Sequence, residues 1–189
     1  MMAWEDDITQ ALHILQQGGV ILYPTDTIWG IGCDATNAQA VQRIYDIKKR
    51  EDSKALICLV GSVEQLQQYV SLTPLMLETL QQPTPKPTTF IYPQAQHLAP
   101  NLLAADGSIA MRITNEPFTQ TLLNRLQKPI VSTSANISGE PSPQNFSEIS
   151  AEIKNQVDYI CYYRQNDSIK FQPSTIIKWE NNQQIVLRK

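Results

Sequence analysis

The sequence has few of the residues from which disulfide frameworks and metal sites are built. It contains three cysteines and two histidines in 189 residues. Cys33, Cys58 and Cys161 lie far apart and form no CxxC pair, which argues against a disulfide framework and favours a reducing compartment. Because the two histidines are isolated and no HExxH motif is present, we expect no metal site made of protein side chains.

The sequence also lacks long apolar runs and a large excess of charge of either sign. No run approaches the ~20 residues that span a bilayer, and the acidic start MMAWEDD is unlike a secretory signal peptide. The formal net charge is −3, so the chain is not a polybasic nucleic-acid binder, although a local basic pocket is compatible with that value. The chain is 42% hydrophobic and 17% charged, as globular proteins are. We expect one domain over residues 1–189, located in the cytoplasm.

The apolar pattern alternates between helical and strand-like segments. Helical spacing is clearest in residues 4–15 and 37–47, whereas residues 24–33 are too polar and too rich in glycine for a regular element. Strands alternating with helices predict an α/β domain. The last strands follow one another without helices, so part of the sheet should be antiparallel. The predicted strands are 20–23, 55–60, 88–92, 108–113, 129–132, 159–162, 174–179 and 184–188, and the other predicted helices are 63–69, 74–80, 116–126 and 146–153.

Most motifs of nucleotide-binding and hydrolytic enzymes are absent. There is no GxxxxGK[ST], no GxGxxG and no GxSxG, which argues against a P-loop, a dinucleotide fingerprint and a nucleophile elbow. Two polar loops remain, 23–30 (YPTDTIWG) and 132–139 (STSANISG), each beside the end of a predicted strand, where ligands bind in open α/β sheets. Between them Lys48, Arg50 and Lys54 supply positive charge that suits phosphate groups. The pattern leaves a second interpretation open. Residues 48–54 would then be a solvated helix end, and the loop 132–139 would be a capping turn.

Three segments, in the order of a known family, carry a resemblance. Residues 19–33 (GVILYPTDTIWGIGC), 47–50 (IKKR) and 132–139 (STSANISG) closely resemble the YrdC-like family of L-threonylcarbamoyladenylate synthases. Shorter matches extend the resemblance from about residue 11 to residue 188. The resemblance implies a YrdC-like α/β fold: a twisted open sheet of mixed parallel and antiparallel strands, flanked by helices, with a concave basic pocket. It also implies the short, single-domain form of the family.

The resemblance implies an activity and its substrates. Members of the family convert L-threonine, bicarbonate and ATP into L-threonylcarbamoyladenylate and pyrophosphate, with Mg²⁺ accompanying ATP. The product then passes to the tRNA threonylcarbamoyl transferase machinery, which completes the threonylcarbamoyladenosine modification of tRNA. The chain is therefore expected to be a nucleotidyltransferase.

The resemblance also assigns roles to individual residues. Lys48 and Arg50 match the basic pair expected to act in catalysis, and Arg112 matches the residue expected to bind the carboxylate of threonine with its planar fork of donors. The residues matched to ATP binding are Lys48, Arg50, Thr89, Ser134, Asn136, Ser142 and Arg188. The residues matched to threonine binding are Thr25, Arg112 and Ser174.

Two alternative functions fit parts of the same pattern. The first is an RNA-binding module without catalysis of its own, which would bind double-stranded RNA or tRNA or act in ribosome maturation. The net negative charge and the absence of an aromatic and basic patch argue against it. The second is an enzyme that makes carbamoyl-adenylate, as a hydrogenase-maturation relative of the domain does within a much longer chain.

The basic pair provides the first prediction. We expect Lys48→Ala and Arg50→Ala each to slow pyrophosphate release by about 10²-fold or more. Each variant lacks a positive charge that is expected to stabilise the transition state. From the sequence alone, neither substitution is expected to unfold the protein. Turnover near the wild-type rate in a folded variant would remove the pair from the mechanism.

Overall fold

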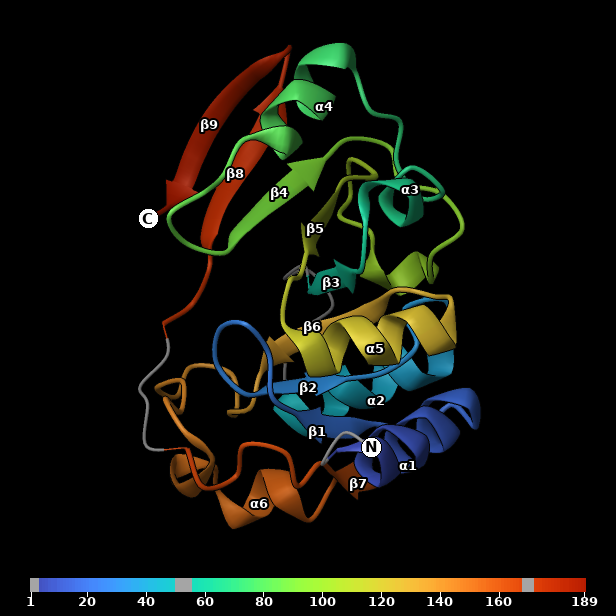
Figure 1. The fold of residues 1–189 in the computed structure, drawn as a ribbon, viewed down its shortest axis with the longest axis vertical. Coiled ribbons are helices and arrows are strands. Elements are labelled where there is room, and N and C mark those ends of the chain that lie inside the picture. The colour runs from blue at the N-terminus through green and yellow to red at the C-terminus, as the bar shows by residue number, and fades with distance from the viewer. Residues whose placement is uncertain (1–3, 50–55, 168–171) are drawn as a thin grey trace.

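The architecture is that of a single twisted sheet with helices on its faces (Figure 1). A computed structural model describes residues 4–49, 56–167 and 172–189. Within these ranges nine strands form one sheet in the order β7-β1-β2-β6-β3-β5-β4-β8-β9. Their bounds are β1 Ile21–Tyr23, β2 Gly30–Gly32, β3 Ile57–Val60, β4 Thr88–Tyr92, β5 Ile109–Ile113, β6 Ile130–Ser134, β7 Tyr159–Ile160, β8 Thr175–Glu180 and β9 Gln183–Arg188.

The sheet is mixed, as predicted. The pairs β7–β1, β3–β5 and β4–β8 are parallel, whereas β1–β2, β2–β6, β6–β3, β5–β4 and β8–β9 are antiparallel. The helices are α1 Glu5–Gln16, α2 Ala38–Lys48, α3 Val63–Leu66, α4 Pro74–Gln81, α5 Pro117–Leu126 and α6 Ala151–Lys154, with short 3-10 turns η1 Pro100–Leu102 and η2 Phe146–Glu148. The predicted α/β class with an antiparallel C-terminal part is therefore confirmed.

Strands in the middle of the sheet are buried on both faces, which explains their uninterrupted apolar sequences. In β1, Ile21 and Tyr23 face the cluster formed with α1 and α5, and Leu22 faces the cluster formed with α2. In β3, Leu59 faces the cluster of α1 and α5, and Cys58 faces the cluster of α2. This alternation follows from the two-residue period of a strand. Figure 1 shows α1 and α5 side by side over one face of the lower half of the sheet.

Three local predictions are corrected by the structure. Residues 24–33 contain a strand after all, because Gly30–Gly32 form β2. The helix predicted at 146–153 is divided into η2 and α6, since Asn145 caps η2 and Ser150 caps α6 with side-chain hydrogen bonds. The helix predicted at 63–69 is only the four residues of α3.

Position 32 of β2 requires glycine because two neighbouring residues leave no room for a side chain. A Cβ on Gly32 would lie 2.5 Å from the backbone oxygen of Val131 and 2.6 Å from Cε1 of Tyr23. Both neighbours belong to strands next to β2, so neither can move without disturbing the sheet. The glycine that disfavours a strand by propensity is therefore required here by close packing.

This close packing generates a stability prediction. Gly32→Ala should lower the free energy of unfolding by about 1–3 kcal/mol, the usual cost of overpacking. Gly61→Ala is the control, because its Cβ would first meet a movable side-chain oxygen of Asn124 at 3.3 Å. Urea unfolding of both variants measures the difference. Equal stability of the two variants would show that β2 can shift to accept a side chain.

Candidate active site

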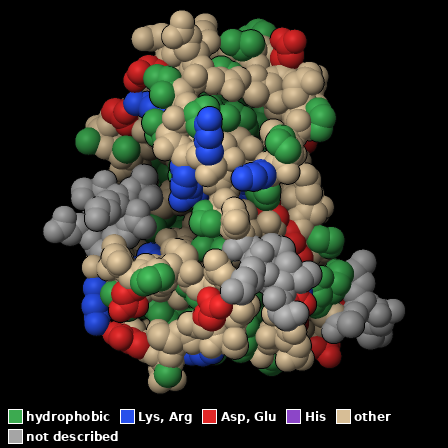
Figure 2. Space-filling view, turned by 90° about the vertical axis from the view of Figure 1, so that its left-hand side faces the viewer, with side chains coloured by type: hydrophobic (Ala, Val, Ile, Leu, Met, Phe, Trp, Pro, Cys, Tyr) green, Lys and Arg blue, Asp and Glu red, His purple; other side chains and the backbone are tan. Residues whose placement is uncertain are grey.

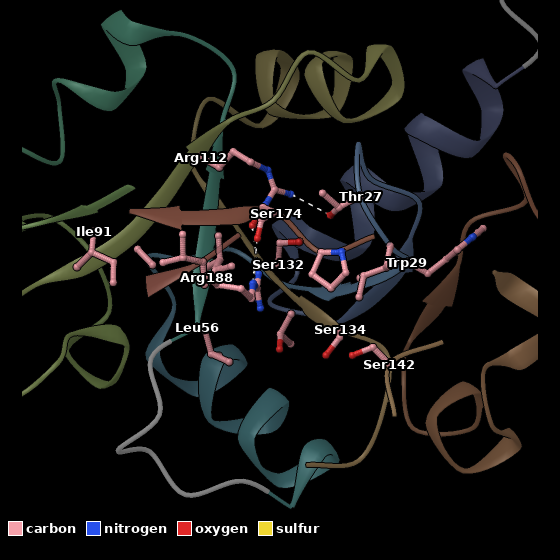
Figure 3. A pocket seen from close by; sticks show the side chains of 17 residues that line it. Thr27, Trp29, Leu56, Ile91, Arg112, Ser132, Ser134, Ser142, Ser174 and Arg188 are labelled. Atoms are coloured by element: carbon pink, nitrogen blue, oxygen red, sulfur yellow. Dashed lines mark hydrogen bonds between the residues drawn. The ribbon is translucent and has the colours of Figure 1, made fainter. Parts of the chain in front are cut away.

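A cavity opens on the part of the sheet that α1 and α5 leave uncovered. Its volume is about 260 Å³, and it lies on the side of the molecule where Figure 2 shows Lys and Arg side chains gathered around a hollow. Strands β3, β4, β5 and β8 each contribute to its lining, and on β5 the alternate residues Ala110 and Arg112 do so because the residue between them points to the opposite face. The side chains labelled in Figure 3 are Thr27, Trp29, Leu56, Ile91, Arg112, Ser132, Ser134, Ser142, Ser174 and Arg188.

Arg112 on β5 provides the buried positive charge of the cavity. Its Nη2 donates to Oδ1 of Asp26 at 2.8 Å and to Oγ1 of Thr27 at 3.4 Å, and its Nη1 donates to Oγ1 of Thr89 at 3.2 Å. Its Nε is buried and has no hydrogen-bond partner within the described ranges. A guanidinium held in this way retains N–H donors for an anionic ligand, and its planar fork suits a carboxylate.

Arg188 approaches the same point from β9 (Figure 3). Its Nε donates to the backbone oxygen of Ser174 at 2.9 Å, and its Nη2 lies 3.4 Å from Oγ of Ser174. The hydroxyl of Ser174 is in turn 2.8 Å from that of Thr89. Burial lowers the pKa of Arg188, and the positive charge of Arg112 lowers it further. Because Arg112 contacts the Thr89 hydroxyl and Arg188 contacts the adjoining Ser174 hydroxyl, the two like charges lie near one another, and an anion between them would relieve their repulsion.

The turn after β1 supplies residues that the sequence did not assign. Thr25 is buried and uses its hydroxyl within the turn: Oγ1 donates to the oxygen of Ile28 at 2.8 Å and accepts from the backbone N of Thr27 at 3.0 Å. As a result Thr27, rather than Thr25, reaches the cavity, and Asp26 reaches Arg112. The sequence does not show which residues of a polar turn point into a cavity and which stabilise the turn. Asp26 and Thr27 do lie inside the polar loop 23–30.

Lys48 lies at the C-terminal end of α2 and is almost fully buried. Its Nζ donates to the backbone oxygens of Ser134 at 2.6 Å and Asn136 at 2.7 Å. Its own backbone oxygen accepts from the N of Ser138 at 2.8 Å. The ammonium group therefore fixes the loop after β6, and it does so from behind the cavity wall. Arg50, the other predicted catalytic residue, lies outside the described residues.

The predicted residues divide into those that line the cavity and those that support it. Ser134 and Ser142 line it, and Asn136 stands behind them, donating through Nδ2 to the oxygens of Ile137 at 3.1 Å and Glu140 at 2.7 Å. Its Oδ1 is buried without a partner in the described part of the chain. The predicted residues that line the cavity are Arg112, Ser134, Ser142, Ser174 and Arg188. Those that lie behind or beside it are Thr25, Lys48, Thr89 and Asn136.

Part of the cavity wall is apolar. Leu56, Ile91, Ala110 and Ile176 form it, and Trp29 closes one side while packing on Phe146 with ring centroids 4.9 Å apart. The cavity thus combines two arginines and several hydroxyls with apolar side chains, which suits a ligand with an anionic end and an apolar end. Among the described residues, no group of three or more His, Cys, Asp or Glu converges, and no helix is long and apolar enough to cross a membrane.

The fold and cavity define an α/β protein with an arginine-lined pocket on an open mixed sheet. The Sua5/YciO/YrdC family model, which is described as telomere recombination, matches residues 13–189. The chain therefore belongs to the Sua5/YciO/YrdC family. This confirms the family resemblance of the three sequence segments.

Individual relatives agree with this assignment. The threonylcarbamoyl-AMP synthase of Vibrio parahaemolyticus is 37% identical over 174 residues, which are 90% of this chain and 93% of that protein. E. coli YciO matches with a TM-score of 0.84 and 28% identity, over 96% of this chain and 88% of that one. P. abyssi Sua5 complexed with L-threonine matches with a TM-score of 0.81 and 26% identity, and the chain spans 53% of its length.

The buried position of Lys48 adds a stability effect to the rate effect expected from the sequence. Lys48→Met keeps the length of the side chain but leaves two backbone oxygens without a charged donor, so it should lower the free energy of unfolding by roughly 2–4 kcal/mol. The adjacent Lys49→Met is the control, because Lys49 is exposed and pairs with Glu152 at 2.8 Å on the surface. Calorimetric unfolding of the two variants measures the difference. Equal melting temperatures would show that the loop after β6 does not depend on Lys48.

Proposed function

We propose that the protein is an L-threonylcarbamoyladenylate synthase that uses L-threonine, bicarbonate and ATP. The observation that supports this most directly is the convergence of Arg112 and Arg188 on one hydroxyl-lined cavity with an apolar wall. The 37% identity to a threonylcarbamoyl-AMP synthase over 90% of the chain supports the same activity. The product would then pass to the machinery that transfers threonylcarbamoyl to tRNA.

Threonine would bind at the Arg112 end. A carboxylate can accept from the guanidinium donors that the protein leaves without partners, and Ser174 and Thr27 offer hydroxyls nearby. The match to a Sua5 structure complexed with L-threonine supports this assignment. Asp26 would keep the guanidinium in place, since its carboxylate pairs with Nη2 of Arg112 at 2.8 Å.

ATP would bind along the rest of the cavity. The apolar wall of Leu56, Ile91 and Ile176 suits the adenine ring, and Ser134, Ser142 and Arg188 provide hydrogen bonds for ribose and phosphate. Arg50 would offset negative charge of the phosphates, and Lys48 would act from behind the wall by holding Ser134 and the loop that follows it. Mg²⁺ would enter with ATP, as the counter-ion of the triphosphate.

The proposed reaction has two steps, and neither needs a nucleophilic side chain. The ammonium group of threonine and bicarbonate give a carbamate, water and one proton. The carbamate oxygen then attacks the α-phosphorus of ATP, and pyrophosphate leaves from the opposite side. Such a transfer depends on positioning and on neutralising charge. Arg188 and the basic residues near the phosphates would lower the barrier by stabilising the charge that develops.

The cytoplasm would be the site of this reaction. Cys33, Cys58 and Cys161 are free and buried. Burial raises the pKa of the Cys58 thiol to about 12, which protects it from reaction. Free buried thiols fit a reducing compartment.

The deciding measurement is pyrophosphate release from ATP with bicarbonate present. We expect release that requires both L-threonine and bicarbonate, because the attacking carbamate needs both. Release that depends on carbamoyl phosphate instead would favour the carbamoyl-adenylate alternative. No release, from folded protein that binds ATP, would contradict the proposal, and tRNA binding measured against salt concentration would then test the RNA-binding alternative.

A further inference from the structure

The turn that presents Asp26 and Thr27 is held from the side opposite the cavity. Arg164 donates through Nη1 to the backbone oxygen of Thr25 at 2.9 Å. The hydroxyl of Thr119 lies 3.2 Å from the backbone oxygen of Pro24. Both holding side chains meet at Glu116, whose Oε2 lies 2.8 Å from the Thr119 hydroxyl and whose Oε1 lies 3.9 Å from Nη1 of Arg164.

Glu116 does more here than cap a helix. It is the N-cap of α5, and Oε2 accepts from the backbone N of Thr119 at 2.7 Å. Short side chains such as Asp, Asn, Ser or Thr normally do this. The longer glutamate caps with one oxygen and directs the other toward Arg164, and its side chain is only 7% exposed. A carboxylate this deeply buried is stabilised only if a cation and donors accompany it.

Arg164 is itself held in an unusual conformation. Its backbone φ is 65°, in the left-handed region that residues with side chains rarely adopt. Its Nε donates to Oδ2 of Asp167 at 2.7 Å, and the Glu116 carboxylate faces its Nη1 at 3.9 Å as an ion pair without a hydrogen bond. Backbone strain that the surroundings impose is common where a side chain has a functional position to keep.

We propose that Glu116 is a positioning residue for the threonine end of the site, which rests on the proposed function above. Glu116 fixes Arg164, Arg164 fixes the carbonyl of Thr25, and the turn then holds Asp26 against Arg112. Each contact on this path holds a group that makes the next contact, so removing the Glu116 charge loosens the contacts that follow. The expected result is a less well-oriented Arg112 and weaker binding of the amino-acid carboxylate.

Glu116→Gln tests the inference while keeping the length of the side chain and the cap of α5. We expect the KM for L-threonine to rise by roughly 3- to 30-fold, the range found for residues that act on a site through a network. The KM for ATP, the kcat and the melting temperature should change little. Arg164→Gln should give the same selective rise, and the double variant should not exceed the larger single effect.

Glu5→Gln is the matched control. Glu5 pairs with Arg125 of the same helix α5 at 2.6 Å, but on the surface, where both side chains are more than a third exposed. This variant should leave both KM values unchanged. A lower melting temperature of Glu116→Gln with an unchanged KM for threonine would reduce Glu116 to a helix cap and overturn the proposal. An equal rise of both KM values would do the same.

A second measurement does not depend on activity. Hydrogen–deuterium exchange of peptides that cover residues 21–30 should be faster in Glu116→Gln than in wild type and in Glu5→Gln. Unchanged exchange would overturn the positioning role even if the protein proved to have another substrate. Conversely, Glu116→Gln could show faster exchange although the protein releases no pyrophosphate. That result would support the positioning role of Glu116 and contradict only the proposed function.

Discussion

The burial of the Arg112 charge is the constraint on which the site depends. A guanidinium with an exposed fraction of 2% would be strongly destabilising without partners. Its partners come from segments far apart in the sequence: Asp26 and Thr27 from the turn after β1, and Thr89 from β4. Because each contact stabilises the same charge, the two halves of the sheet are fixed relative to one another at the cavity. The charge that a ligand needs also holds the cavity together.

Lys48 applies the same principle to the loop after β6. Its ammonium group donates to the backbone oxygens of Ser134 and Asn136, so a loop rich in small polar residues keeps one conformation. The side chain of Ser134 is thereby fixed at the end of β6, and that of Asn136 is placed in the loop beyond it without a helix or strand of its own. A basic residue can therefore shape a cavity from behind its wall, by donating to backbone oxygens.

The sequence predicted the elements of the fold better than the contacts of the site. Residues such as Ile21, Leu22 and Tyr23 show burial on both faces directly, because a strand that is covered twice must be apolar throughout. The sequence does not predict β2, since its Gly32 is explained by the approach of Val131 and Tyr23, which is a property of the folded sheet. Likewise Glu116 and Arg164 carry no local signal, because their roles arise from contacts between segments that are distant along the chain.

The same distinction explains why matched site residues do not all reach the cavity. Thr25 and Thr27 are the same residue type in the same polar loop. The hydroxyl of Thr25 stabilises the turn, whereas that of Thr27 faces the cavity. The proposed reaction works by orientation and charge rather than through a nucleophilic side chain, so it would need such supporting residues as much as contacting ones. Its specificity must then lie in how rigidly the turn and the loop are held. For this reason buried ion pairs and backbone hydrogen bonds behind the wall belong to the functional description of this fold.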